Sequence, residues 1–299
     1  MKKVVVTGGA GFIGSNLVDR LIELGYDVHI IDDLSTGKGE NINQKATLYK
    51  LDISDTDELR LKSIIDGSEY VFHLAAKTAV QESLTSPEIY ENVNCLGLLK
   101  LLKASSECNI KRFVFSSSSS IYGNAMKFPT SETHPKNPLS PYALSKLIGE
   151  QYCKLFSKVY GLDTVCLRYF NVFGDRMNNE GGYKLLFPIF KELKKKGLPL
   201  TINNDGEQRR DFIHVKDVVR ANIISATFLP DFNGDCYNIG SGKNYSVNEI
   251  ASIFGGPKKH ITGIIEPKET LAEISKADLD LNFRPRLSLK EWLHTWITI

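Results

Sequence analysis

The chain has 299 residues, of which 42% are hydrophobic and 24% charged, the composition of a globular protein with room for a full core. Its net charge of +2 gives no electrostatic reason to expect nucleic acid or a membrane surface as a partner. Five cysteines are scattered without a CxxC pair, and no apolar run reaches membrane-spanning length. The scattered cysteines lead us to expect neither a metal centre nor a disulfide framework. The first strand starts close to the N-terminus, so we expect no signal peptide and a cytoplasmic protein.

The first predicted element is a β-branched strand, residues 4–7, which leads into a turn containing Gly8, Gly11 and Gly14 and then an amphipathic helix over residues 15–24. Glycines let the backbone turn tightly and approach a diphosphate, and the N–H groups of a helix N-terminus favour its negative charge. The spacing is Gly-x-x-Gly-x-x-Gly rather than Gly-x-Gly-x-x-Gly. The turn by itself therefore indicates a dinucleotide without excluding a glycine-rich turn of another α/β protein.

A second strand, residues 28–31, ends at Asp32-Asp33, about 20 residues beyond the glycines, where a ribose-binding carboxylate is expected. Binding of a 2′-phosphate at this point would need a cation, and the following residues offer none before Lys38. The sequence therefore favours NAD over NADP. Asp52 follows the third strand, and two interpretations stay open for it, an adenine contact or the cap of the next helix.

Strands and helices alternate through the first half of the chain, which predicts a doubly wound parallel sheet with helices on both faces. The further predicted strands are residues 47–50, 70–74, 112–115 and 163–167, and the helices are residues 88–106 and 142–160. Beyond residue 170 come loops, a helix over residues 185–196 and a strand, 236–239, expected to return to the sheet. We predict an α/β, Rossmann-type fold: a cofactor domain of residues 1–169 with 212–240, and a smaller C-terminal lobe of 170–211 with 241–299.

Tyr142 and Lys146 open the predicted helix 142–160, and their spacing of four places both side chains on one helix face. A tyrosine has a pKa of about 10 and is a poor base at neutral pH. A neighbouring ammonium and a positively charged nicotinamide would lower that pKa towards the working range. Five serines, residues 116–120, end the preceding strand and could orient a substrate hydroxyl. The competing interpretation is ordinary turn chemistry next to a surface helix.

Several segments stand in a characteristic order: TGGAGFIG (7–14), IDDLSTG (31–37), LDI (51–53), HLAA (73–76), SSSSSIYG (116–123), PLSPYALSK (138–146), RYFNVFG (168–174) and GEQRRDFIHVKDV (206–218). On these segments nearly the whole chain resembles the extended short-chain dehydrogenase/reductase family, and within it the NAD-dependent nucleotide-sugar 4-epimerases. The resemblance implies a catalytic trio of Ser118, Tyr142 and Lys146. It implies transient oxidation at C4 to a 4-keto sugar, which rotates and is reduced on its other face.

The resemblance also implies the ligand contacts. Those to NAD would come from Gly8, Gly11, Phe12, Ile13, Gly14, Asp32, Asp33, Ser35, Thr36, Gly37, Asp52, Ile53, Leu74, Ala75, Ala76, Lys77, Asn94, Ser116, Tyr142, Lys146 and Tyr169. Those to a nucleotide-diphosphate sugar would come from Val80, Ser118, Tyr142, Asn171, Leu186, Arg210 and Thr270. UDP is the default nucleotide of such enzymes.

The residues before Ile121 separate the chemistries within this family. Related 4,6-dehydratases resemble Thr-Asp-Glu there, decarboxylases carry a glutamate at the position of Ser120, and fucose-forming epimerase/reductases use a cysteine. This chain has Ser118-Ser119-Ser120 and therefore lacks those groups. The pattern favours epimerisation at one carbon. A one-way 4-reductase or dehydrogenase with exchangeable cofactor, an epimerase for another nucleotide sugar, and a non-catalytic dinucleotide-sensing protein are the alternatives.

Two features of the C-terminal lobe bear on substrate binding: one departs from the family pattern, and the other is a position at which family members differ. The Arg-x-Gly-Asp stretch that grips the pyrophosphate in many relatives aligns with residues 263–266, where the arginine is missing, and Lys258, Lys259 or Lys268 would have to replace it. Thr270 aligns with a gate residue, at which a bulky side chain restricts the pocket to plain hexoses. A small threonine favours tolerance of 2-acetamido sugars.

Relatives commonly form dimers through two helices of each subunit, here residues 88–106 and 142–160. A homodimer with a four-helix seam is therefore expected. Apolar side chains on these helices are compatible with that seam and equally with packing on the sheet: Leu98, Leu99, Leu102, Leu147, Cys153 and Phe156.

Overall fold

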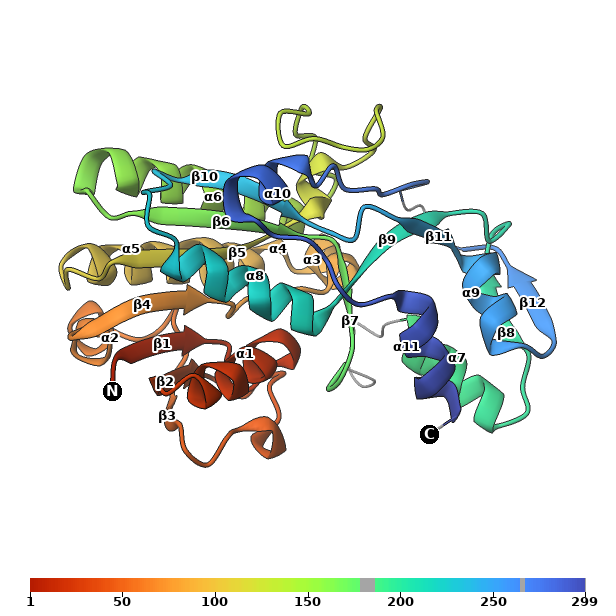
Figure 1. The fold of residues 1–299 in the computed structure, drawn as a ribbon, viewed down its shortest axis with the longest axis horizontal. Coiled ribbons are helices and arrows are strands. Elements are labelled where there is room, and N and C mark those ends of the chain that lie inside the picture. The colour runs from red at the N-terminus through yellow and green to blue at the C-terminus, as the bar shows by residue number, and fades with distance from the viewer. Residues whose placement is uncertain (178–185, 264–266, 299) are drawn as a thin grey trace.

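The computed structural model of the protein describes residues 1–177, 186–263 and 267–298. Within them, the larger part is a seven-stranded sheet in the order β3-β2-β1-β4-β5-β6-β10, with every neighbouring pair parallel (Figure 1). The order reverses between β1 and β4, which is the switch point of a doubly wound fold. The strands are β1 Lys3–Thr7, β2 Asp27–Asp32, β3 Thr47–Lys50, β4 Ser68–His73, β5 Arg112–Ser118, β6 Thr164–Tyr169 and β10 Asp235–Ile239.

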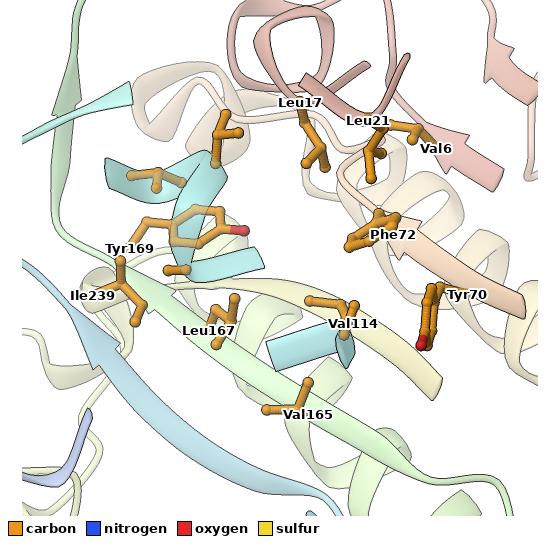
Figure 2. Close-up of a cluster of buried hydrophobic side chains, with 14 of the residues drawn as sticks. Val6, Leu17, Leu21, Tyr70, Phe72, Val114, Val165, Leu167, Tyr169 and Ile239 are labelled. Carbon is orange, nitrogen blue, oxygen red and sulfur yellow. The ribbon is translucent and has the colours of Figure 1, made fainter. Parts of the chain in front are cut away.

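Helices cover both faces of this sheet because each strand sends alternate side chains to opposite sides. Val4 and Val6 of β1 join the core under α1 (Phe12–Glu23), α8 (Val215–Thr227) and α10 (Ser275–Leu281). Figure 2 shows this cluster, with Leu17 and Leu21 of α1 lying over Val6 and Phe72. Val5 points the other way, into the core beneath α2 (Glu58–Ile65), α5 (Leu98–Ser106) and α6 (Pro141–Tyr160).

The predicted helix over residues 88–106 is present but is not α-helical throughout. It consists of α4 (Pro87–Tyr90), a π-helical stretch (Glu91–Gly97) and α5, and it follows the short helix α3 (Val80–Thr85). Such π-helical stretches occur frequently at functional sites. The helix α1 begins at Phe12, three residues earlier than predicted, so that Gly14 belongs to its first turn. β5 runs three residues beyond the predicted end because its serines pair with β6.

A second group of elements lies beyond the carboxyl ends of the sheet strands (Figure 1, right). It contains the three-stranded sheet β11-β9-β7 and the pair β12-β8. Aromatic and aliphatic side chains form its core, and Phe12 of the glycine turn packs against that core. The elements are β7 Asn171–Phe173, α7 Leu186–Lys195, β8 Leu200–Asn203, β9 Arg209–His214, β11 Asn244–Ser246, α9 Val247–Phe254, β12 Lys258–Ile261 and α11 Leu289–Thr298.

The chain returns to the main sheet through α8 and β10, and Cys236–Ile239 pairs with β6. Residues 212–214 end β9 and pair with β7 in the smaller sheet, while the side chain of Ile213 packs in the core of the main sheet, and α8 follows at Val215. The domain boundaries themselves stay a prediction. No helix of the described residues is long and apolar enough to cross a membrane.

Two polar contacts join the segment after β7 to α1. The side-chain amide of Asn16 donates to the carbonyl of Asp175 (3.1 Å), and the guanidinium of Arg176 lies 2.7 Å from the carboxylate of Asp19. The C-terminal lobe is therefore attached directly to the helix that follows the glycine turn.

Candidate active site

The glycine turn lies at the end of β1, at the switch point of the sheet. Gly8 has a φ of +71°, and a β-carbon there would be 2.6 Å from the amide nitrogen of Ala75. A β-carbon at Gly14 would be 2.0 Å from the carbonyl oxygen of Gly8. Gly11 donates its N–H to that oxygen (3.1 Å) and is the N-cap of α1. The first N–H groups of α1, from Phe12 to Gly14, can therefore face a diphosphate without side chains in between.

Asp32 ends β2 beside this turn and is buried. Its two carboxylate oxygens accept the backbone N–H groups of Ala10 and Leu34, both at 2.9 Å. Burial raises the pKa of Asp32, and these hydrogen bonds oppose that shift. A β-carbon at Gly37 would come within 2.9 Å of the Asp32 carboxylate. The carboxylate is thus held at the strand end with room beside it, which suits the ribose hydroxyls of NAD.

Asp52 does not cap the next helix, so that interpretation is wrong. The cap of α2 is Asp57, whose carboxylate accepts from the backbone N–H of Arg60 (2.9 Å). Asp52 instead accepts from the N–H and hydroxyl of Ser54. Burial opposes ionisation of Asp52, but these hydrogen bonds outweigh it and lower its pKa. The side chain of Ile53 is buried in the core, so only its backbone is available to an adenine.

The loop after β4, residues 74–77, reaches across the switch point to the loop after β2. Lys77 donates its ammonium to the hydroxyl of Ser35 (2.9 Å), and the same nitrogen lies 4.0 Å from the carboxylate of Asp33. Asn94, in the π-helical stretch, binds the backbone of Lys77 twice. Its side-chain oxygen accepts the N–H of Lys77 (2.8 Å), and its side-chain amide donates to the carbonyl of Lys77 (3.0 Å). Its amide also donates to the hydroxyl of Ser145 (2.9 Å). These contacts join α6 to the predicted NAD loops. Thr36 lies in the same loop as Ser35.

The helix α6 begins where its sequence dictates. Ser140 caps it by accepting from the N–H of Ala143 (3.1 Å), and Pro141 occupies the first turn. Lys146, one turn after Tyr142, is buried and donates to the carbonyl of Ser116 (2.9 Å). Burial lowers the pKa of Lys146 to about 8. The ring of Tyr142 packs edge-on against Tyr90, with centroids 6.5 Å apart.

Ser118 is the last residue of β5, and its hydroxyl accepts from the N–H of Ser120 (3.2 Å). Ser116 points to the other face of the strand from Ser117, and its hydroxyl bonds to that of Tyr169 (3.0 Å). Tyr169 in turn donates to the side chain of Asn222 (2.9 Å), and burial raises the pKa of Tyr169 to about 12. The hydroxyls of Ser116 and Tyr169 are thus engaged inside the fold.

Three of the predicted substrate residues meet beside β9. Asn171 opens β7, and its amide donates to the carbonyl of Asp211 (3.0 Å) and to the hydroxyl of Thr270 (3.3 Å). Thr270 donates its N–H to the carbonyl of Arg209 (3.0 Å), next to Arg210. Arg209 is held by Asn244 and Glu249, and the guanidinium of Arg210 donates to the carbonyl of Arg209 (2.9 Å). Val80 opens α3 and Leu186 opens α7, on other elements.

The position of the family's Arg-x-Gly-Asp stretch lies in part outside the described residues, since residues 264–266 are not described. Among the three lysines that could replace its arginine, Lys258 donates to the hydroxyl of Ser252 (2.9 Å) and Lys259 is exposed on β12. Lys268 accepts the N–H of Arg209 with its carbonyl (2.9 Å). Lys268 is therefore adjacent to the strand that carries Arg210.

A buried acid, Glu150, lies beside the serines of β5 and was not among the site residues predicted from the sequence. It lies on α6 one turn after Lys146 and binds Arg168 of β6 through two hydrogen bonds, at 2.8 and 2.7 Å. Its carboxylate also accepts from the hydroxyl of Ser117 (2.6 Å). The signal that could have found it is the spacing, because Tyr142, Lys146 and Glu150 follow one another at intervals of four residues.

The strand order, the glycine turn at the switch point, Asp32 at the end of β2 and the Tyr142–Lys146 pair define an NAD-dependent enzyme with a Rossmann fold. Residues 4–240 match the model of the NAD dependent epimerase/dehydratase family. Over 97% of its length the chain is 34% identical to the UDP-glucose 4-epimerase of Mycolicibacterium smegmatis and covers 95% of that relative.

Solved structures agree with this match. The UDP-glucose 4-epimerase of Thermotoga maritima with UDP-glucose has a TM-score of 0.93 and 37% identity, over 99% of this chain and 97% of that one. The UDP-N-acetylglucosamine 4-epimerase of Methanobrevibacter ruminantium M1, in complex with UDP-N-acetylmuramic acid, has a TM-score of 0.93 and 39% identity, again over 99% and 97%. The chain belongs to the NAD dependent epimerase/dehydratase family.

These findings confirm the predictions of the family, the doubly wound Rossmann-type fold, the cofactor NAD and an NAD-dependent nucleotide-sugar 4-epimerase. The non-enzymatic alternative is thereby excluded. The roles of the individual site residues stay predictions.

Proposed function

We propose that the protein interconverts the C4 epimers of UDP-sugars and that it accepts the pair UDP-N-acetylglucosamine and UDP-N-acetylgalactosamine in preference to UDP-glucose and UDP-galactose. The observation that carries this preference is the contact between Thr270 and Asn171, which puts a small side chain beside a predicted substrate residue. A relative of known structure is named as a UDP-N-acetylglucosamine 4-epimerase, which supports the same pair.

The residues at the ends of β5 and α6 would share the proton chemistry. The glycine turn and Asp32 would hold NAD, which when bound would supply the hydride chemistry at C4 of the sugar. Tyr142, as phenolate, would take the proton of the 4-hydroxyl and give it back, while Ser118 would hydrogen-bond the same oxygen. Lys146 is protonated below its pKa of about 8, and its charge would favour the phenolate while it holds the nicotinamide ribose. Arg210, with Lys268 next to its strand, would bind the diphosphate.

The experiment is to incubate the purified protein, without added cofactor, with each of the four UDP-sugars and to resolve the products by proton NMR. We expect interconversion within both C4 pairs, faster for the 2-acetamido pair because Thr270 leaves room at C2. Faster turnover of UDP-glucose would contradict the role of Thr270. A requirement for added NAD would favour the one-way reductase or dehydrogenase, and silence with bound NAD would indicate another nucleotide or sugar.

We further propose a homodimer formed through α4, the π-helical stretch and α6. The structure buries Leu98, Leu102, Cys153 and Phe156 against the main sheet, so these residues are not available to the seam. Other apolar side chains on the same elements face solvent, at 39 to 47% exposure: Ile89, Leu96, Leu144 and Leu155. Leu144 also lines a hollow of about 330 Å³ with Pro87, Glu88, Glu91 and Pro141.

A charge in this surface tests the proposed dimer. Leu144 and Leu155 are separated by three helical turns and share one face of α6. Light scattering on a sizing column should give twice the mass of one chain for the wild type and the mass of one chain for Leu144→Glu. A wild-type monomer at micromolar concentration would contradict the proposal.

The five cysteines are all free, which is compatible with a cytoplasmic location.

A further inference from the structure

Two hydrogen bonds join the helix α6 to β5, the strand that carries Ser118. Lys146 donates to the carbonyl of Ser116 (2.9 Å), and one helical turn later Glu150 accepts from the hydroxyl of Ser117 (2.6 Å). Tyr142 lies one turn earlier on the same helix face, and Ser118 is the next residue of the strand. The helix that carries Tyr142 is thus tied to the end of β5 by two hydrogen bonds, and one of them is to the residue next to Ser118.

Glu150 fixes two strands at once. Arg168 is the register partner of Ser117 in the pairing of β5 with β6, and both side chains bind the carboxylate of Glu150. Glu150 and Arg168 are almost completely buried, at 2 and 3% exposure. Water therefore does not compete for their hydrogen bonds, which are stronger in the low-dielectric interior. The remaining guanidinium nitrogen of Arg168 donates to the hydroxyl of Tyr122 (2.8 Å) and to the carbonyl of Glu132 (3.0 Å).

We propose that Glu150 is a positioning residue of the epimerase: by binding Ser117 and Arg168 at one level, it sets the distance between Ser118 and Tyr142. This inference rests on the roles proposed above for those two residues. Catalysis by positioned groups is sensitive to shifts of about 1 Å, which can reduce the rate roughly a hundredfold. A merely stabilising ion pair would affect the amount of folded protein but not the rate per folded molecule.

Ser117→Ala is the variant that tests the proposal. Removal of Glu150 itself would leave Arg168 charged and buried without its partner, and the protein could simply fail to fold. Ser117→Ala removes only the hydrogen bond to Glu150 and leaves the ion pair intact. We expect kcat per bound NAD to fall about tenfold, with KM for the UDP-sugar within twofold of the wild type and the melting temperature within a few degrees.

A matched control is Ser105→Ala in α5. Ser105 is equally buried, lies outside the site, and its hydroxyl has no hydrogen-bond partner in the part of the chain that the structure describes. Its kcat and KM should stay within twofold of the wild type.

An unchanged kcat in Ser117→Ala, a KM that rises in step with the loss of kcat, or an equal loss in Ser105→Ala would each overturn the positioning role. Failure of the proposed function is separate, because then the wild type itself would not turn over these sugars, or Tyr142→Phe would retain full activity.

Discussion

Replacing Tyr142 by phenylalanine should reduce turnover by about 10²–10⁴-fold while NAD stays bound, since a positioned acid–base group contributes roughly that factor. The hydroxyl is the only group that the change removes, and the ring that packs against Tyr90 is retained. Lys146 keeps its hydrogen bond to Ser116 and can still hold the nicotinamide ribose. The measurement is kcat from NMR progress curves, with NAD determined in the supernatant of the denatured protein.

The matched control for this experiment is Tyr152→Phe, a half-buried tyrosine on the same helix that packs on the core beneath α6. Its turnover should stay within about twofold of the wild type, because the lost hydroxyl has no proposed part in the chemistry. Wild-type activity in Tyr142→Phe would show that another group moves the proton. An equal loss in both variants would point to a general effect on α6.

The second large effect is expected for Gly14→Ala, which should yield a folded protein that carries less than about a tenth of the wild-type NAD. Alanine is the better helix former by about 1 kcal/mol, so helix propensity alone would stabilise the variant. Packing decides otherwise, because the new β-carbon would lie 2.0 Å from the carbonyl oxygen of Gly8. The turn must open, and the first N–H groups of α1 lose their place at the diphosphate.

The cofactor content of Gly14→Ala is read from the absorbance of the denatured supernatant, and turnover is measured with and without added NAD. Gly39→Ala serves as the control, because a β-carbon there meets no atom within 4 Å and its backbone is not in the left-handed region. Gly39→Ala should keep both NAD and activity. A Gly14→Ala protein that purifies with one NAD per chain would contradict the argument from the close contact.

Local patterns were sufficient for the main elements of the fold. The strand over residues 47–50 matches β3, and the helix predicted over residues 142–160 starts within one residue of α6. Such signals are carried by neighbouring residues and by periodicity, and therefore survive in a single sequence. The π-helical stretch was not visible, because its sequence has the same helical period as its flanks. Asp52 could be an adenine contact or a helix cap by sequence, because a carboxylate just after a strand suits both; in the structure it accepts from the N–H of Ser54 and Asp57 is the cap.

By itself, the sequence determined the class of fold, the glycine turn, the carboxylate of Asp32 at the end of a strand and the Tyr142–Lys146 pair, since each depends on residues close together in the chain. Only the tertiary structure decided the strand order, the contact of Asn171 with Thr270 and the attachment of Glu150 to Ser117 and Arg168. Asn171 and Thr270 are 99 residues apart. Contacts between distant segments arise when sheets and helices pack together, and no local periodicity records which partners will meet.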